Sequence, residues 1–594
     1  MNRLLFTAVA TVCCATSIHS QDFFVKELVF PADADSVAKI EMAGRVVPSA
    51  QQLAWQQRPL TAFLHFGMNT FTDREWGDGK ESPQLFNPTK LDTDQWVKTL
   101  KDAGFEMVIL TAKHHDGFCL WPTSTTSHSV ASSAWRDGKG DVVADLRRSC
   151  DKYGMKLGLY LSPWDRNAQC YGSEEYNDMF VAQLTELLSN YGKVDEVWFD
   201  GACGEGPNGK KQVYDWLRYR ETMRRLQPEA VLAITGDDVR WVGNEGGCGR
   251  ETEWSVTPLV PSIFSYADSV NSSLGIDAMS PLIGSREMVA KADRLYWWPS
   301  EVDVSIRPGW FYHDNEQPHS MDRMAKIYLE SVGRNSTLLL NVPPNAEGLI
   351  SPADCERLVQ FHDWIQANFH SNDQNKKTDG INCVELREDI TKGQRVESFE
   401  VLGMVNGQWQ KITEGTTIGN CRLLTFDPVI ADSLMLNVTA SRGEPYARIA
   451  DSYHIRMPEL IRTPQQQVEY VSRYPEIEAT PLITMASTVD APEVTIGWSK
   501  KQEIAGFIYT PDRTGGGDVI YHYAVQVSND MKKWKDVEVN GEFGNIKANP
   551  IPHEVVFGKP VKARAIRIIC RETADGNEYR PELSQFTILA PIRQ

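Results

Sequence analysis

Between residues 60 and 369, short apolar runs alternate with longer segments of helical period. The apolar runs are rich in β-branched and aromatic residues, and several end at a polar residue beside glycine or proline. They predict strands at 61–67, 105–114, 156–162, 194–200, 230–236, 295–304 and 337–342, and helices at 92–103, 142–153, 174–191, 210–226, 321–332 and 352–369. This α/β alternation is typical of a (β/α)8-like TIM barrel, although residues 237–289 show no clear sixth unit.

Beyond about residue 375 the helical period disappears. Short alternating runs at 401–405, 423–426, 433–438, 504–509, 521–527 and 565–569 are separated by Gly, Asn, Asp and Pro. We therefore predict a barrel at 21–375 followed by two β-sandwich domains, at 376–480 and 481–594, with a linker near 463–469. We expect the first sandwich to cover apolar barrel surface, so that a chain ending at residue 375 folds poorly. The second sandwich should be easier to remove.

Residues 1–20 have the pattern of a cleaved signal peptide. Arg3 precedes an apolar stretch, and small residues precede Gln21. This predicts an exported protein, periplasmic in a Gram-negative bacterium and otherwise secreted. Lipoprotein anchoring at Cys13 is disfavoured by the bulky Val12 before it. No later stretch has the ~18 apolar residues that a membrane helix needs, so we expect no transmembrane segment.

Composition narrows the possible partners. The net charge of −18 argues against a nucleic-acid or anionic-membrane partner. Seventeen tryptophans suit the stacking of sugar rings, although tryptophan is more often a packing residue. The cysteines after residue 20 are odd in number and widely spaced, which indicates neither a disulfide framework nor a metal site. No cofactor is predicted, and the oligomeric state is left open.

Polar residues recur where the predicted strands end. His65 ends the first strand, His114 and His115 the second, and Asp200 the fourth, while Glu245 lies in the loop after the fifth. Singly, each could be a helix cap or a satisfied core residue. Because the carboxyl ends of barrel strands share one rim, their recurrence there predicts an active site.

Two carboxylates among histidines and tryptophans suit hydrolysis of a glycosidic bond. One carboxylate, Asp200, could attack or activate, while the other, Glu245, protonates the leaving oxygen. Rim histidines could instead bind zinc. His114 and His115 are adjacent, however, and would diverge on a strand, so we expect no metal.

Six stretches of the chain are familiar in combination. They read HFGMNTFTD at 65–73, EWG at 75–77, KHHDGF at 113–118, WFDG at 198–201, VGNE at 242–245 and LNVPPN at 340–345. Together they resemble the α-L-fucosidases of glycoside hydrolase family 29, over about residues 60–350. The resemblance implies Asp200 as nucleophile, Glu245 as acid/base, and a fucose pocket lined by His65, Glu75, Trp76, His114, His115, Tyr160, Trp198 and Trp310.

The stretch around Glu245 resembles the subfamily acting on α-1,3/1,4-linked fucose. The resemblance thus implies a retaining, exo-acting α-L-fucosidase that uses a covalent fucosyl-aspartate and whose partners are fucosylated, Lewis-type oligosaccharides or glycoconjugates. Gly246 and Gly247 depart from the bulkier residue expected after the acid/base. Should Glu245 not be that residue, Glu301 is the next carboxylate to consider.

The last domain resembles the discoidin-like (F5/8 type C) domains in residues 507–511, 527–530 and Trp534. Such domains often bind carbohydrate, and others only brace a barrel. Two rival functions remain open: a non-catalytic carbohydrate-binding protein and an exo-glycosidase of other specificity, such as an α-galactosidase. The presence of both Asp200 and Glu245 disfavours the first rival.

Overall fold

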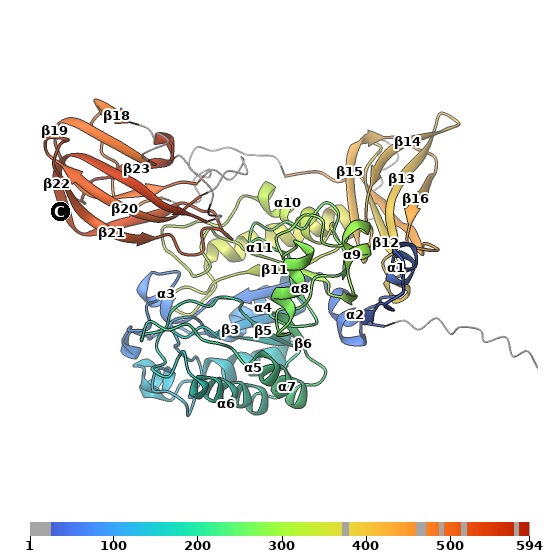
Figure 1. Cartoon of the computed structure of the whole chain (residues 1–594), viewed down its shortest axis with the longest axis horizontal. Helices are drawn as coiled ribbons and strands as arrows, with labels where there is room; N and C mark the ends of the chain where they lie inside the picture. The colour runs from blue at the N-terminus through green and yellow to red at the C-terminus, as the bar shows by residue number, and fades with distance from the viewer. Residues whose placement is uncertain are drawn as a thin grey trace, which may run out of the picture.

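A computed structural model describes residues 25–370, 379–458, 471–485, 492–511, 519–574, 576 and 581–592. The predicted signal peptide and the predicted linker at 463–469 lie outside these residues. A central barrel carries two β-domains, which lie on opposite sides of it (Figure 1). The predicted fold class, a TIM-like barrel followed by β-domains, is confirmed.

The barrel contains eight parallel strands in the order β6-β5-β4-β3-β2-β11-β10-β7. Among the described residues no strand pairing joins β6 to β7, so the barrel is nearly closed. The strands are β2 (Leu60–Leu64), β3 (Met107–Lys113), β4 (Lys156–Leu161), β5 (Glu196–Phe199), β6 (Val231–Ile234), β7 (Arg240–Trp241), β10 (Ser300–Ser305) and β11 (Thr337–Asn341).

The outer helices follow the predicted periodicity, with boundaries set by side-chain caps. The carboxylate of Asp92 accepts from the backbone N–H of Asp94 and Gln95 at the start of α4, and Asp141 caps α5 in the same way. The predicted helix at 210–226 begins only at Trp216, where Asp215 caps it. The surrounding helices are α4 (Thr93–Asp102), α5 (Val142–Tyr153), α6 (Glu174–Asn190), α7 (Trp216–Leu226), α10 (Met321–Ser331) and α11 (Pro352–Ile365).

The predicted strand at 295–304 is two strands. β9 (Arg294–Trp297) pairs antiparallel with β1 (Glu27–Val29) and β8 (Val256–Thr257), outside the barrel. After Pro299 the chain enters the barrel as β10, because proline lacks the N–H that a continuous strand needs. The missing sixth strand is the two-residue β7, too short for any periodicity. The remaining helices are α1 (Ser36–Ala43), α2 (Ala50–Gln56), α3 (Met68–Thr72), α8 (Ala267–Leu274) and α9 (Arg286–Lys291).

The first β-domain is a sandwich of two three-stranded sheets, β15-β12-β17 and β14-β13-β16. Besides its own core, it contributes Cys383, Leu423, Tyr453 and Ile455 to the hydrophobic core of the barrel. The expectation that this domain covers apolar barrel surface is therefore confirmed. Its strands are β12 (Ile381–Glu388), β13 (Val396–Val405), β14 (Gln408–Gly415), β15 (Arg422–Val429), β16 (Leu434–Ser441) and β17 (Ala447–Tyr453).

The second β-domain has its own aromatic core. It contacts the barrel through a long loop and through the segment that precedes it, where Arg473 pairs with Asp73 at 3.0 Å. Glu476 bridges to Leu589, so residues before 481 also pair with this domain. Its strands are β18 (Ile483–Met485), β19 (Glu493–Tyr509), β20 (Ile520–Ser528), β21 (Trp534–Glu542), β22 (His553–Thr573) and β23 (Phe586–Leu589). The loop 543–552 between β21 and β22 extends to the carboxyl-terminal rim of the barrel.

No helix in the described part of the chain combines the length and apolar character needed to cross a membrane. The cysteines after residue 20 are all free thiols.

Candidate active site

A cavity of about 330 Å³ opens at the carboxyl ends of the barrel strands. All the predicted site residues except Glu75 line it. Its walls are formed by Phe63, His65, Trp76, His114, His115, Tyr160, Trp198, Asp200, Gly201, Ala202, Ile234, Trp241, Glu245, Asp303, Trp310, Asn545 and Ala548. The residues predicted at the strand ends thus lie in one continuous site. Seven of the barrel strands and the last domain contribute residues to it.

Asp200 follows directly after β5, with its side chain 24% exposed to the cavity. The Tyr160 hydroxyl donates to its Oδ2 at 3.0 Å, and the backbone N–H of Ala202 donates to its Oδ1 at 2.8 Å. Nε2 of His115 lies 3.9 Å from Oδ2. Each carboxylate oxygen therefore has a donor that holds it in place and stabilises negative charge.

His115 and His65 are neutral and offer an acceptor nitrogen. Burial lowers the pKa of each to about 4. The Ser162 hydroxyl donates to the carbonyl of Trp164, so Nδ1 of His115, 2.7 Å away, must donate to that hydroxyl. Nδ1 of His65 likewise donates to the Asn341 amide oxygen at 2.9 Å. In both rings Nε2 is left as the acceptor.

His114 has the opposite tautomer. Asn69 donates through Nδ2 to the carbonyl of Glu75 at 3.0 Å, which fixes its amide, and the same Nδ2 lies 3.4 Å from Nδ1 of His114. Nδ1 is thus an acceptor and Nε2 carries the proton. Burial holds the pKa of His114 well below its usual range. The three histidines together provide two acceptors and one donor for substrate hydroxyl groups.

Two hydrogen-bond donors contact the carboxyl group of Glu245. Nε1 of Trp310 and Nδ2 of Asn545 donate to its Oε2, at 2.7 and 2.8 Å. Burial raises the pKa of Glu245 well above its usual range, Asp303 and Asp200 raise it further, and the two donors lower it. Because both donors meet Oε2, the proton of the neutral acid resides on Oε1.

Glu75 does not line the cavity but supports it from behind. Its carboxylate accepts from the backbone N–H groups of Trp310 and Phe311, at 2.7 and 3.0 Å, and contacts Nε2 of His313 at 2.8 Å. Burial opposes a charged imidazole, but hydrogen bonds to Asp73 and Glu75 raise the pKa of His313 to about 10. The predicted pocket residue is therefore an anchor for the segment that carries Trp310.

Gly309 makes this anchoring possible. A Cβ at this position would lie 2.8 Å from Oε1 of Glu75, closer than a carbon can approach. The glycine in Arg307-Pro308-Gly309-Trp310 thus lets the Glu75 carboxylate approach without being displaced from its donors.

Sequence reasoning missed eight residues of the cavity, among them Trp241, Asp303, Asn545 and Ala548. Nε1 of Trp241 donates to Oδ1 of Asp303 at 2.9 Å, and burial raises the pKa of Asp303 well above its usual range. Asp303 lies two residues after Glu301 on β10, so the two acids share one face of the strand. A prediction with the correct strand boundaries would have revealed this spacing. Asn545 and Ala548 come from the last domain and carry no local signal.

Glu301, the alternative acid/base, does not line the cavity. It is fully buried, and its Oε1 accepts from Nε1 of Trp198 at 2.8 Å. Its side chain also faces Glu196, and burial raises the pKa of Glu196 to about 7. Glu301 therefore supports Trp198 from inside the barrel and has no direct route to a leaving group.

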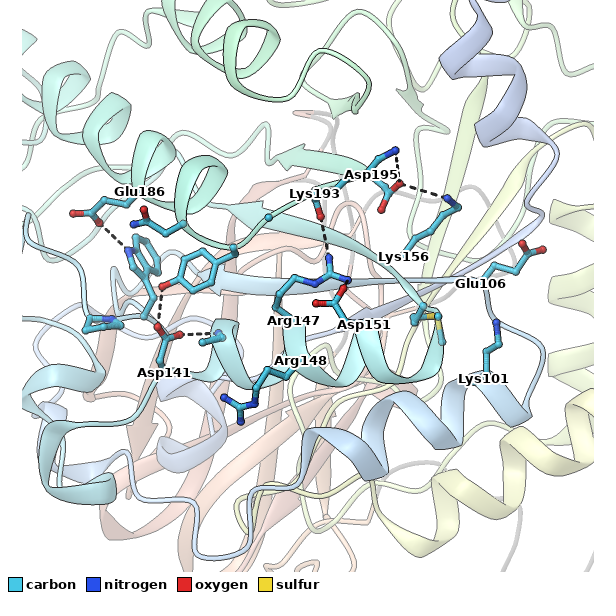
Figure 2. A pocket seen from close by; sticks show the side chains of 18 of the residues that line it. Lys101, Glu106, Asp141, Arg147, Arg148, Asp151, Lys156, Glu186, Lys193 and Asp195 are labelled. Carbon is cyan, nitrogen blue, oxygen red and sulfur yellow. Dashed lines mark hydrogen bonds and ion pairs between the residues drawn. The ribbon is translucent and has the colours of Figure 1, made fainter.

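A larger cavity, of about 1010 Å³, runs along the outside of the barrel beside α5, from Asp141 at one end of this helix to Lys156 at the other (Figure 2). Lys156 and Asp195, at the beginnings of β4 and β5, line it and lie 3.5 Å apart. Arg147 donates to Asp151 at 2.6 Å within the same hollow. It lies outside the barrel, whereas chemistry in such barrels belongs to the carboxyl ends of the strands, so we do not assign it a function.

Within the described residues no group of three or more His, Cys, Asp and Glu side chains is arranged to hold a metal ion. The site is a small cavity on a (β/α)8 barrel, with two carboxyl groups in unlike environments. This arrangement is typical of the glycoside hydrolases.

Comparisons with known proteins identify the family. Residues 49–370 match the family model described as Alpha-L-fucosidase, and residues 484–580 match the F5/8 type C domain. "Alpha-L-fucosidase 1" of Arabidopsis thaliana is 42% identical over 451 residues, which cover 67% of this chain and 86% of that protein. The chain belongs to the α-L-fucosidases of glycoside hydrolase family 29.

Solved structures agree with this assignment. A putative α-L-fucosidase from Bacteroides ovatus is 48% identical, with a TM-score of 0.72, and the match covers 96% of this chain and 99% of that one. A Ruminococcus gnavus GH29 fucosidase in complex with fucose is 30% identical, with a TM-score of 0.60, covering 72% of this chain and 97% of that one.

Proposed function

We propose that this enzyme releases terminal α-1,3/1,4-linked L-fucose from Lewis-type glycans, with retention of configuration, through a covalent intermediate on Asp200. The observation that carries this proposal is the unlike environment of two carboxyl groups facing one cavity. Donors contact both carboxyl oxygens of Asp200, whereas burial and neighbouring acids raise the pKa of Glu245 and keep its proton in place.

The reaction follows from these two states. A carboxylate oxygen of Asp200 attacks the anomeric carbon while Oε1 of Glu245 gives its proton to the departing glycosidic oxygen. Glu245, now a carboxylate, then takes a proton from water, and the resulting hydroxide attacks the same carbon and releases Asp200. Two inversions leave the anomeric configuration unchanged.

The cavity suits a single deoxy sugar. Its volume of about 330 Å³ is near the lower end for small-molecule sites, which supports exo action. The acceptors on His65 and His115 and the donor on His114 match sugar hydroxyl groups, and the aromatic walls suit a C6 methyl. The Ruminococcus gnavus relative, described in complex with fucose, supports the same sugar.

The linkage preference rests on the resemblance of residues 242–245 to the branched-linkage subfamily. The decisive experiment compares fucose release from a Lewis trisaccharide with release from a 2′-fucosylated disaccharide, and follows the first-formed anomer by NMR. We expect fast release from the trisaccharide, slow release from the α-1,2 linkage, and α-L-fucose as the first product. Equal rates on the two linkages would refute the subfamily assignment, and β-fucose first would refute retention.

The same assay distinguishes the rival functions. A carbohydrate-binding protein would bind without turnover on any glycoside. An α-galactosidase would cleave an aryl galactoside and leave the aryl fucoside intact.

Replacing Asp200 with glycine removes the nucleophile while Tyr160 and His115 remain. We expect turnover to fall by several orders of magnitude, in line with the barrier reduction that covalent catalysis provides. Added azide should restore part of the rate and give the β-fucosyl azide, because the small anion fills the vacated space. An Asp200→Gly variant that keeps near wild-type activity would exclude this residue as nucleophile.

Replacing Glu245 with alanine removes the proton donor. General acid catalysis contributes about 10²–10⁴-fold, and only a poor leaving group needs it. We therefore expect a loss of that size on the trisaccharide and a much smaller loss on a 4-nitrophenyl fucoside. Comparable losses on both substrates would show that Glu245 is not the acid.

A further inference from the structure

The last domain reaches into the site through its loop 543–552. Asn545 and Ala548 of this loop line the cavity beside Glu245. Nδ2 of Asn545 donates to the carboxyl oxygen Oε2 of Glu245 at 2.8 Å, and the backbone N–H of Glu245 donates to the carbonyl of Ala548 at 3.2 Å. Both the side chain and the backbone of Glu245 are thus held by a domain that begins more than two hundred residues later.

The loop is anchored at both ends. Phe543 and Ile546 are buried in the core of the last domain. On the barrel side, Nδ2 of Asn549 donates to the carbonyl of Pro308 at 3.3 Å. A Cβ added to Gly544 would lie 3.0 Å from the ring of Trp76, so the loop backbone packs against a cavity residue. The loop is therefore built against the barrel.

Asn545 itself has the left-handed backbone conformation, with φ of 60°. Asparagine and glycine adopt this conformation at the lowest cost, while most other side chains are strained in it. The backbone N–H of Asn549 bonds to the Asn545 carbonyl at 2.9 Å and closes the turn. This conformation presents the amide of Asn545 to Glu245.

We propose that loop 543–552 completes the active site and that Asn545 is a positioning residue, which orients the Glu245 carboxyl toward the leaving group. This inference rests on the proposed function, because it takes Glu245 to be the acid/base. The last domain thereby becomes part of the catalytic unit.

Glu245 is restrained by its hydrogen bonds more than by its own backbone. Glu245 is followed by Gly246 and Gly247, so the covalent chain restricts it little. Trp310 and Asn545 approach the same oxygen, Oε2, and together fix the plane of the carboxyl group and leave Oε1 for proton transfer. Loss of one donor lets the group rotate, and misplacement of an acid by about 1 Å costs about 10²-fold in rate.

The contact also sets the titration of Glu245. The acidic groups that face it are Asp200 and Asp303, and both disfavour its ionised form. Asn545 donates to the carboxylate and favours ionisation. Removing the amide should therefore move the basic limb of the pH profile of kcat/KM to higher pH, a shift that a merely structural role would not cause.

The test uses the full-length enzyme with Asn545→Gly, which keeps the backbone conformation, and Asn545→Asp, which keeps the shape and removes the donor. The matched control is Asn406→Gly in the exposed turn after β13, where φ is 51°. Each is assayed on the Lewis trisaccharide and on a 4-nitrophenyl fucoside.

We expect both Asn545 variants to lose roughly 10–100-fold in kcat/KM on the trisaccharide, a part of the full general-acid contribution, and to lose little on the aryl fucoside. The basic limb should move to higher pH, further in Asn545→Asp, where a second carboxylate faces Glu245. The control should match the wild type. Equal losses on both substrates, or no loss on either, would overturn the proposal.

A readout independent of turnover separates this proposal from the proposed function. Hydrogen exchange in residues 242–248 should be faster in Asn545→Gly than in the wild type or the control, because the loop no longer restrains Glu245. Unchanged exchange would overturn the inference even in an active enzyme. Failure of the wild type to cleave any fucoside would instead overturn the proposed function.

Discussion

At the scale of single residues, the site shows how environment separates chemically similar acids. Asp200 ends a strand beneath two donors, whereas Glu245 lies among aromatic rings and other acids. Asp303 lines the same cavity, and Glu301, two residues earlier, is buried under Trp198. Position relative to donors, water and other charges decides which acid attacks, which protonates and which only supports.

Asp303 should tune the acid/base. Its carboxyl group raises the pKa of Glu245, so Asp303→Asn, which keeps an acceptor for Trp241, should lower that pKa. Glu245 then loses its proton at lower pH, and the basic limb of kcat/KM should fall by about one pH unit. The exposed Asp314→Asn variant serves as control. A basic limb that stays in place would show that Asp303 does not tune the pKa of Glu245.

At the scale of elements, periodicity located the barrel where segments are long and regular. The helices α4, α5, α6 and α11 begin within two residues of their predicted starts, because Asp, Ser and Pro mark those starts in the sequence. Prediction failed where two short strands follow each other, at β9 and β10. Apolar content alone cannot tell a strand that pairs in the barrel from one that pairs outside it.

The same contrast between local pattern and tertiary packing explains which site residues could be predicted. The carboxyl end of each strand is visible in the sequence, so the residues placed there were found. Glu75 lies in a loop, and only packing shows that it holds the backbone of Trp310 instead of lining the cavity. Trp241 lies in β7, a strand of only two residues, which is too short to show a periodic pattern.

At the scale of the whole molecule, three domains share two functions, stability and catalysis. The first sandwich supplies side chains to the barrel core, while the second supplies a loop to the cavity. That the second sandwich is easier to remove than the first stays a prediction, and the contact of its loop with Glu245 adds a division of roles. One domain keeps the barrel folded, and the other completes its active site.

Two truncations test this division. A chain of residues 21–375 lacks the cover provided by Cys383, Leu423, Tyr453 and Ile455. Burial of an aliphatic side chain such as Leu423 or Ile455 stabilises by about 1.5–3 kcal/mol. We expect it to aggregate or to melt well below the full-length protein in calorimetry. A chain of residues 21–458 should fold, cleave aryl fucosides and act poorly on the trisaccharide.

The opposite pattern would refute the division of roles. A stable, fully active barrel alone would show that the first sandwich adds nothing to folding. Full activity of residues 21–458 on the trisaccharide would show that loop 543–552 is dispensable.

The sequence by itself determined the barrel, the order of its elements and the residues at its strand ends, because these depend on local periodicity and on the geometry shared by all parallel barrels. Only the tertiary structure decided which acids face the cavity, which tautomer each histidine has, and that Asn545 meets Glu245. Those outcomes depend on contacts between residues far apart in the chain, where burial and hydrogen bonding, not local pattern, set the chemistry.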